Sequence, residues 1–458
     1  MKKSIRSLIA IGIALNIAYA GIMPAYAADN YTLGQNKTLA TSIAKAYDPS
    51  INKPIISCET LIKKAQDTSG KLALKSKEIA MYRNQMKTQE KLDDQIGASE
   101  LGDLKSDYTR YFVESTSDYY IDRYKINIDQ AKQDKEYMED KIARDIRDKY
   151  EEIVLMEIQI SRTQKELDVN SNTSKYAGIN VETGYGTENT KLGADIQVKK
   201  LKNDITSMQN LLKNKKDYLG VLTDTDLNMY SFDYNLSYAP ITIGNEENYF
   251  NNLIDNYLTY KNKLLNLSED YRDDLKDEVD SSPDEPDEPD KPDFGAISRL
   301  MNSDWSILSS DVGQSAVKSQ VNKINDQTKE YLKYTKEYIE YVQELNTYMK
   351  YCEINYNVES SKVELDDGKK KMKNELEEAY TSLRSLESQI DLMNDQFEYI
   401  NNNLLYAKVQ RDTGMMTEND YNSKVAQAEE LELGLRQMVN GYNKLKDTIQ
   451  QPWIALDQ

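Results

Sequence analysis

The sequence predicts a predominantly α-helical protein in which long antiparallel coiled-coil hairpins form two tandem repeats, with little β-structure. Three observations lead to this prediction. The sequence matches itself at one fixed offset, its apolar residues recur at helical spacing over long stretches, and 29% of its residues are charged, with a mean hydropathy of -0.75. With only 18 Gly and 9 Pro, this composition favours long, solvated amphipathic helices over one large globular core.

The internal repeat runs without a gap through a large part of each half. The matched residues include Tyr150 and Tyr380, Gly184 and Gly414, and the Thr-Glu-Asn runs at 187–189 and 417–419. Apolar positions keep the same offset, for example Ile153 with Leu383 and Leu201 with Leu431. A match of this length indicates two copies of one supersecondary unit.

The first 27 residues predict a signal peptide. Lys2, Lys3 and Arg6 precede an apolar run over residues 8–20, and Ala25-Tyr26-Ala27 forms a small-x-small cleavage site. We therefore expect an exported protein of the cell envelope. The mature chain is predicted to comprise a first repeat with an inter-repeat segment (28–272), an acidic proline-rich linker (273–295) and a second repeat (296–458).

The charge and the residue types exclude several classes of function. The formal net charge is -19, and such a surface repels nucleic acid. The chain has no histidine, which removes the commonest general base and metal ligand, and we find no nucleophile, dinucleotide, phosphate-loop or calcium-loop motif. We predict that the protein is not an enzyme and uses no cofactor or metal.

Along the chain, residues 59–91 predict a helix and residues 108–167 a much longer one. The aromatic and polar residues alternate over 230–238, which predicts a short strand. Residues 281–293 repeat proline among acidic residues and predict an extended, solvated spacer; calcium binding by the acidic side chains is the alternative. Cys58 and Cys352 are predicted to be separate, buried thiols, although export would permit a disulfide.

A tyrosine-rich stripe marks the second half. Its members recur at spacings of three and four residues, which is a heptad pattern typical of helix-to-helix packing. They are Tyr331, Tyr334, Tyr338, Tyr341, Leu345, Tyr348 and Cys352. A tyrosine-lined site for a sugar or peptide is the alternative interpretation.

Each long hairpin is predicted to turn at a glycine followed by a threonine. Glycine tolerates the left-handed conformation that ends a helix, and threonine caps the next helix. The two predicted tips consist of Gly184, Tyr185, Gly186 and Thr187, and of Gly414, Met415, Met416 and Thr417. Asp420 follows Thr417 by three residues, close to a capping box, whereas Thr190 holds that position in the first copy.

An exported chain with two such halves resembles the TolC-type outer-membrane efflux protein family, whose hairpin tips read Gly-x-x-Ser/Thr-x-x-Asp. The second tip matches fully at Gly414, Thr417 and Asp420, and the first retains Gly184 and Thr187. The resemblance covers about residues 140–222 and 370–450. It implies a homotrimeric helical tunnel for solute or protein export, whose tips bind a membrane-fusion adaptor that connects it to a membrane pump.

By position, the resemblance assigns the adaptor contact to the tip residues Gly184, Tyr185, Gly186, Thr187, Gly414, Met415, Met416, Thr417 and Asp420. A hairpin turn without a partner is the alternative for each. The family also implies paired membrane strands in each half, but residues 96–118 and 351–368 are too short or too polar for them. We therefore expect a reduced or absent barrel. The location would be the outer membrane if a barrel forms, and otherwise the cell surface or the outside of the cell. The alternative function is a non-transporting coiled-coil spacer.

Overall fold

The computed structural model describes residues 37–39, 53–98, 107–279, 281–303 and 310–454. The predicted signal peptide and its cleavage site lie outside the described residues. The chain divides into two compact units: unit 1 takes 1–79, 130–257 and 370–458, and unit 2 takes 80–129 and 258–369. Each unit therefore combines segments from both halves of the sequence.

Long helices dominate both units, as predicted. The longest are α4 (Asp107–Glu182), α5 (Glu188–Thr223), α9 (Asp311–Asp412) and α10 (Glu418–Gln450). Shorter helices are α2 (Cys58–Thr68), α3 (Gly70–Ala98), α6 (Glu246–Tyr257), α7 (Thr259–Glu278) and α8 (Gly295–Ser303). The predominantly helical fold class is confirmed. Among the described residues, no helix combines the length and the hydrophobicity needed to cross a membrane.

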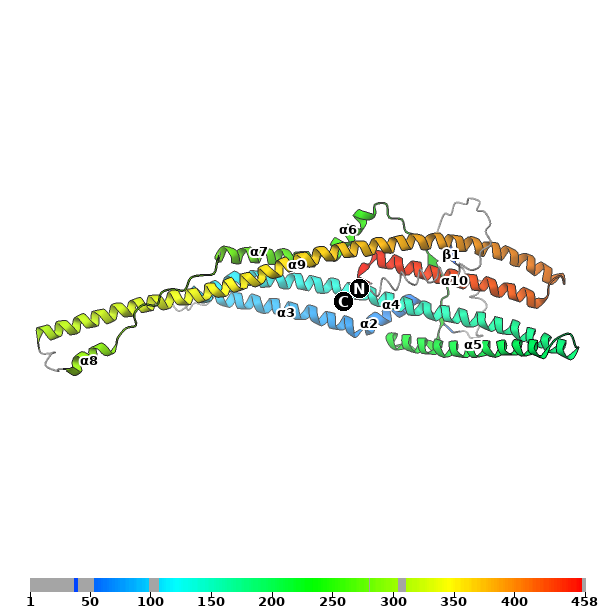
Figure 1. The fold of residues 1–458 in the computed structure, drawn as a ribbon, viewed down its shortest axis with the longest axis horizontal. Coiled ribbons are helices and arrows are strands. Elements are labelled where there is room, and N and C mark those ends of the chain that lie inside the picture. Colours follow the sequence, from blue (N-terminus) through cyan, green and yellow to red (C-terminus); the bar gives the residue numbers. More distant parts are fainter. Residues whose placement is uncertain (1–36, 40–52, 99–106, 280, 304–309, 455–458) are drawn as a thin grey trace. The chain divides into compact units, whose positions relative to one another are not determined.

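In unit 1, the hairpins α4–α5 and α9–α10 lie in one layer in the order α9, α10, α4, α5 (Figure 1). Side-chain contacts join each neighbouring pair. Tyr442 of α10 bonds to Glu387 of α9, Arg436 of α10 pairs with Glu151 of α4, and Lys215 of α5 pairs with Glu152 of α4. Within this layer of four helices, α9 and α5 therefore stand at the two edges.

The core of unit 1 lies where α2, α4 and α5 meet. Leu61, Ile153 and Leu219 are fully buried there and belong to one hydrophobic cluster. Burying one such side chain contributes about 1.5–3 kcal/mol, so this cluster fixes α2 against the first hairpin. The predicted helix 59–91 is divided here, because Ser69 leaves the helical conformation between α2 and α3.

The segment between the halves holds short strands. The predicted strand at 230–238 is two strands, β3 (Ser231–Phe232) and β4 (Leu236–Tyr238), divided by a turn in which the Asp233 carboxylate accepts from the Asn235 N–H at 3.0 Å. Strand β3 pairs in parallel with β2 (Ile55–Ile56), and β4 pairs antiparallel with β1 (Lys37–Leu39). A 3-10 turn, Leu227–Met229, precedes β3.

In unit 2, α7 packs antiparallel on α9. Lys362 pairs with Glu269 at 2.6 Å and Arg272 with Glu359 at 3.6 Å, next to the buried Val358. Residues 351–368 are helical throughout, and so are 107–118. The two segments that we judged unsuited to paired strands are thus helical wherever they are described.

The cysteines are both free, as predicted, but neither is fully buried. Cys58 is partly buried beside the core of unit 1, and burial raises the pKa of its thiol to about 12. Cys352 is exposed on α9, so the prediction that it is buried was wrong. Its position in the heptad stripe places it near Tyr348.

Candidate functional site

The first hairpin tip closes α4 by hydrogen bonds to one carbonyl. Tyr185 and Gly186 both donate their N–H groups to the carbonyl of Asn180, at 2.7 and 2.8 Å. Gly184 has a φ of 80°, in the left-handed region that glycine adopts without a side-chain clash. This arrangement satisfies carbonyls that the helix end would otherwise leave unpaired.

The second tip has the same backbone geometry at the equivalent residues. Met415 and Met416 donate to the carbonyl of Gln410, at 2.7 and 3.1 Å, and Gly414 has a φ of 75°. The glycine in each tip is therefore required by the backbone and not by close packing, since a Cβ atom at Gly184 or Gly414 would meet nothing within 4 Å.

The threonines cap the returning helices as predicted. The Thr187 hydroxyl accepts from the N–H of Thr190 at 3.2 Å, and the Thr417 hydroxyl accepts from the N–H of Asp420 at 3.1 Å. The Thr417 hydroxyl also donates to the carboxylate of Asp420 at 2.7 Å. Asp420 thus binds the capping hydroxyl, and it is not the backbone acceptor that a capping box would contain.

The tips differ in the side chains that they present. Tyr185 is 89% exposed and Met415 is 82% exposed, although both are large apolar residues. Gly186 and Met416, one residue further on, are half-buried. Each tip consequently offers one exposed apolar anchor, a feature typical of a protein contact.

Alanine is expected to change the stability in opposite directions at a tip glycine and at a glycine inside a helix. Replacing Gly414 with alanine is expected to destabilise the protein by about 1–2 kcal/mol, because a Cβ atom disfavours the left-handed conformation. Gly368 lies inside α9, where an added Cβ atom would meet nothing within 4 Å, and its replacement by alanine is expected to stabilise by about 0.5–1 kcal/mol. Urea unfolding followed by circular dichroism measures both changes; equal signs would contradict the assigned tip conformation.

The two hairpins are joined near their tips by polar contacts. Asn419 of α10 donates to the hydroxyl of Thr173 of α4 at 3.1 Å. Further along the same helices Arg162 pairs with Glu430 at 3.2 Å, and Lys165 pairs with Glu429. Because these contacts link α4 of the first hairpin to α10 of the second, they hold the two tips near each other.

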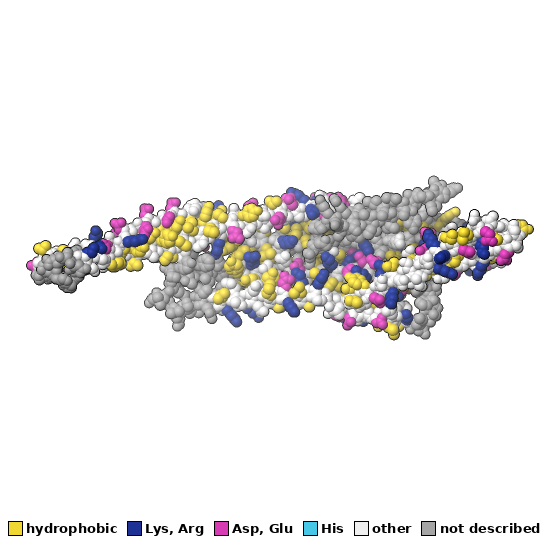
Figure 2. Space-filling view, turned by 60° about the horizontal axis from the view of Figure 1, so that its bottom comes forward, with side chains coloured by type: hydrophobic (Ala, Val, Ile, Leu, Met, Phe, Trp, Pro, Cys, Tyr) yellow, Lys and Arg dark blue, Asp and Glu magenta, His cyan; other side chains and the backbone are white. Residues whose placement is uncertain are grey.

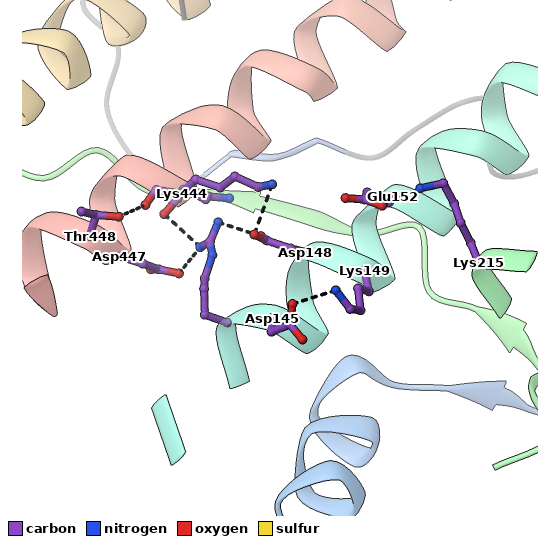
Figure 3. A network of polar contacts seen from close by, with 10 residues as sticks. Asp145, Asp148, Lys149, Glu152, Lys215, Lys444, Asp447 and Thr448 are labelled. Atoms are coloured by element: carbon purple, nitrogen blue, oxygen red, sulfur yellow. Dashed lines mark hydrogen bonds and ion pairs between the residues drawn. The ribbon is translucent and has the colours of Figure 1, made fainter. Parts of the chain in front are cut away.

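A second group of contacts joins the same helices farther from the tips (Figure 3). Arg144 lies between Asp148 of its own helix, at 2.8 Å, and Asp447 of α10. Lys444 of α10 reaches Asp148 at 3.3 Å. Alternating charges across the α4–α10 contact thus fix the register of one hairpin against the other.

The sequence analysis missed a matched pair of buried carboxylates. Glu157 and Glu387 occupy the same position in the two halves, and both are buried. Glu157 accepts from the Tyr234 hydroxyl at 2.5 Å and pairs with Lys216, while Glu387 accepts from the Tyr442 hydroxyl at 2.8 Å. The signal was present in the sequence, because a charged residue recurs at the repeat offset within an apolar stripe.

Two matched tyrosines hold the segment between the halves. The Tyr150 hydroxyl accepts from the N–H of Asp233 at 2.5 Å, and the equivalent Tyr380 hydroxyl accepts from the N–H of Ile243 at 3.3 Å. Burial raises the pKa of Tyr150, so its phenol stays protonated at neutral pH. The repeat offset identified this pair, but its partners became visible only in the fold.

The outer helices of the layer in unit 1 expose apolar side chains. On α5 these include Leu192, Ile196, Leu211 and Tyr218, and on α9 they include Leu392, Tyr399, Leu405, Tyr406 and Val409. Contiguous exposed apolar faces mark interaction surfaces in soluble chains. We name them the α5 edge and the α9 edge.

The described tips present apolar side chains, amides, hydroxyls and paired charges such as Arg411 with Asp412 at 2.7 Å. Within the described part of the chain, no three potential ligands are grouped so that they could hold a metal ion.

The fold defines a class of helical proteins whose paired antiparallel hairpins end in tight, capped tips. Solved structures with a similar chain course include the outer membrane protein VceC from Vibrio cholerae (TM-score 0.45, 11% identity, covering 87% of this chain and 94% of VceC). The Campylobacter jejuni CmeC outer membrane channel gives a TM-score of 0.48 at 11% identity, covering 94% of each chain.

A membrane protein from Pseudomonas aeruginosa gives a TM-score of 0.47 at 11% identity, covering 95% of this chain and 99% of that protein. The sequence matches no protein-family model and no curated protein. These similarities concern the course of the chain and assign no partner or residue role to it.

Proposed function

We propose that this chain is a TolC-like efflux channel component, exported to the cell envelope, which forms a helical conduit together with a membrane-fusion adaptor and a membrane pump. Three copies would form the conduit, and the tips would bind the adaptor. The observation that carries this proposal is the layer of two hairpins with matched tips and two different apolar edges.

The edges support a closed ring. The α5 edge and the α9 edge differ in sequence and lie on opposite sides of the layer in unit 1. A contact between two different surfaces of identical chains is heterologous, and it closes into a ring when the rotation between copies permits. Assembly would cover side chains such as Ile196 and Leu405, each of which contributes about 1.5–3 kcal/mol when fully buried.

Cross-linking tests the ring. We expect the variant with Ile196→Cys and Leu405→Cys, in a Cys352→Ser background, to form covalent dimers and trimers with a short flexible bis-maleimide. Both sites lie within about three helical turns of the tips, taking ~5.4 Å per turn. Cys58 can remain, because the raised pKa of its thiol keeps it protonated and slow to react.

The matched controls are the two single-cysteine variants. A heterologous contact does not bring Ile196 next to Ile196 of another copy, so each single variant is expected to remain uncross-linked. Cross-linking by a single variant would indicate a two-fold dimer. A monomer by sedimentation, with no cross-link in the double variant, would refute the conduit and leave the coiled-coil spacer as the function.

Adaptor binding is tested at the tips. A photoreactive residue placed at Tyr185 or at Met415 is expected to cross-link in intact cells to a membrane-fusion adaptor, identified by mass spectrometry. The same residue at Lys213, which is exposed on α5 far from the tip, serves as the matched control and should not react with it. Absence of an adaptor product at both tips would refute the docking assignment while leaving the ring intact.

A further inference from the structure

The acidic segment between α7 and α8 has a face that is covered along its whole length. Its prolines stand at every third position, 283, 286, 289 and 292, and all four are half-buried. Every other residue from 281 to 293 is exposed. A polyproline-II helix has three residues per turn, so this burial pattern is that of such a helix with its proline ridge against a surface.

Contacts in unit 2 identify that surface as α9. The ion pair between α7 and α9 at Glu269 and Lys362 establishes an antiparallel course. Beyond α7 the same course continues, because Glu288 lies near the hydroxyl of Tyr334, and Lys291 lies near those of Tyr331 and Tyr334. The segment thus runs along the stripe that we predicted would pack on a helix.

The stripe forms a ladder of tyrosine rings. Adjacent ring centroids are 5.9 Å apart for Tyr331 and Tyr334, 5.8 Å for Tyr334 and Tyr338, and 5.9 Å for Tyr338 and Tyr341. In this part of the chain, around α9, Figure 2 shows hydrophobic side chains, proline and tyrosine included, crowded together. A ladder of flat aromatic rings is the kind of surface that extended proline-rich peptides recognise.

One turn of the proline segment and one heptad of α9 have nearly the same length along their axes. One turn of polyproline-II advances about 9.3 Å, at ~3.1 Å per residue, and one heptad of an α-helix advances about 10.5 Å, at ~1.5 Å per residue. The proline ridge therefore stays nearly in step with the heptads of α9 over the length of the segment. A second α-helix would bury more surface, but recurrent proline forbids it here.

We propose that residues 281–293 form a polyproline-II strap bound to the tyrosine ladder of α9. The ladder is thus a binding site for an extended proline-rich peptide, and the chain itself supplies that peptide. The acidic residues lie on the outward faces of the strap, where mutual repulsion keeps it extended. Lys291 pairs with Glu288 at 3.1 Å on the same segment. This inference is independent of whether the protein forms a conduit.

Tyrosine nitration of the full-length protein tests the strap. With tetranitromethane and residue-level mass spectrometry, we expect Tyr331, Tyr334 and Tyr341 to react more slowly than Tyr356, which is 72% exposed on the same helix. In the variant with Pro286→Gly and Pro289→Gly the protected tyrosines should approach the rate of Tyr356. Glycine is chosen because alanine would permit α7 to continue as a helix.

The matched control replaces Asp284, Asp287 and Asp290 with asparagine, which keeps the prolines and removes outward charge. This variant is expected to retain the protection. Circular dichroism and the nitration rate of Tyr185 should be the same in all variants if only the strap is released. Unchanged protection in the glycine variant, or a loss confined to the asparagine variant, would overturn the proposal.

Discussion

Replacing Arg436 with methionine is expected to lower the free energy of unfolding by about 3–5 kcal/mol, because it leaves a buried charge without its partner. Arg436 is 3% exposed. One of its guanidinium nitrogens donates to the Glu151 carboxylate at 3.0 Å, and another donates to the carbonyl of Tyr234. Urea unfolding followed by circular dichroism measures the loss.

The stability lost on replacing Arg436 should depend on pH, and the direction of this dependence can be stated. Burial raises the pKa of Glu151, and the charge of Arg436 opposes that rise. A carboxyl whose pKa is higher in the folded than in the unfolded state binds a proton on folding, so stability falls as pH rises through that window. Without Arg436 the pKa rises further. The deficit of the variant should therefore shrink as the pH is lowered and Glu151 becomes neutral.

Two controls isolate the buried pair. Combining Arg436→Met with Glu151→Leu removes both charges and is expected to recover much of the lost stability. Arg162→Met breaks the more exposed pair with Glu430, between the same two helices, and should cost less than about 1 kcal/mol. A double variant no more stable than Arg436→Met would contradict the role given to Glu151.

Replacing Tyr442 with alanine is expected to destabilise the protein by about 3–5 kcal/mol, as is typical when a large buried ring is removed. Tyr442 is fully buried, and its ring meets Tyr238 edge-on at 5.0 Å. Its hydroxyl accepts from the N–H of Ile241 at 2.9 Å and donates to Glu387 at 2.8 Å. One side chain thus connects α10, α9 and the segment between the halves.

Tyr442→Phe separates the hydroxyl from the ring. It is expected to cost about 1–3 kcal/mol, because it leaves the Ile241 N–H and a buried carboxylate short of a partner. Tyr176→Ala, at an exposed position on α4, should change the stability by about 0.5 kcal/mol or less. Thermal unfolding compares the three variants. If Tyr442→Phe were as damaging as Tyr442→Ala, the ring would contribute nothing beyond its hydroxyl.

The hairpins could be predicted because their causes are local. Helical periodicity, a glycine in the left-handed conformation and a capping threonine all act within a few residues of each other. The positions of Gly184 and Gly414 therefore followed from the sequence, together with the turns that they form. The helix break at Ser69 was not predicted. A single serine is a weak local signal for a break, and this break depends on how α2 packs.

The partners of the buried polar groups could not be predicted. Glu157 and Glu387 are conspicuous at the repeat offset, but their bonds to Tyr234 and Tyr442 join residues distant in the sequence. Nothing local distinguishes such a carboxylate from the many on solvated faces. Likewise, the sequence does not distinguish Met416, which is half-buried, from its exposed neighbour Met415.

The helical class, the two hairpins and the residues at their tips could be predicted without a structure, because periodicity and capping are properties of short segments. The neighbours of each helix, the partners of the buried charges and the cover of prolines over the tyrosine ladder became visible in the folded chain. Those outcomes depend on contacts between segments far apart in the chain, whose energies no local pattern records.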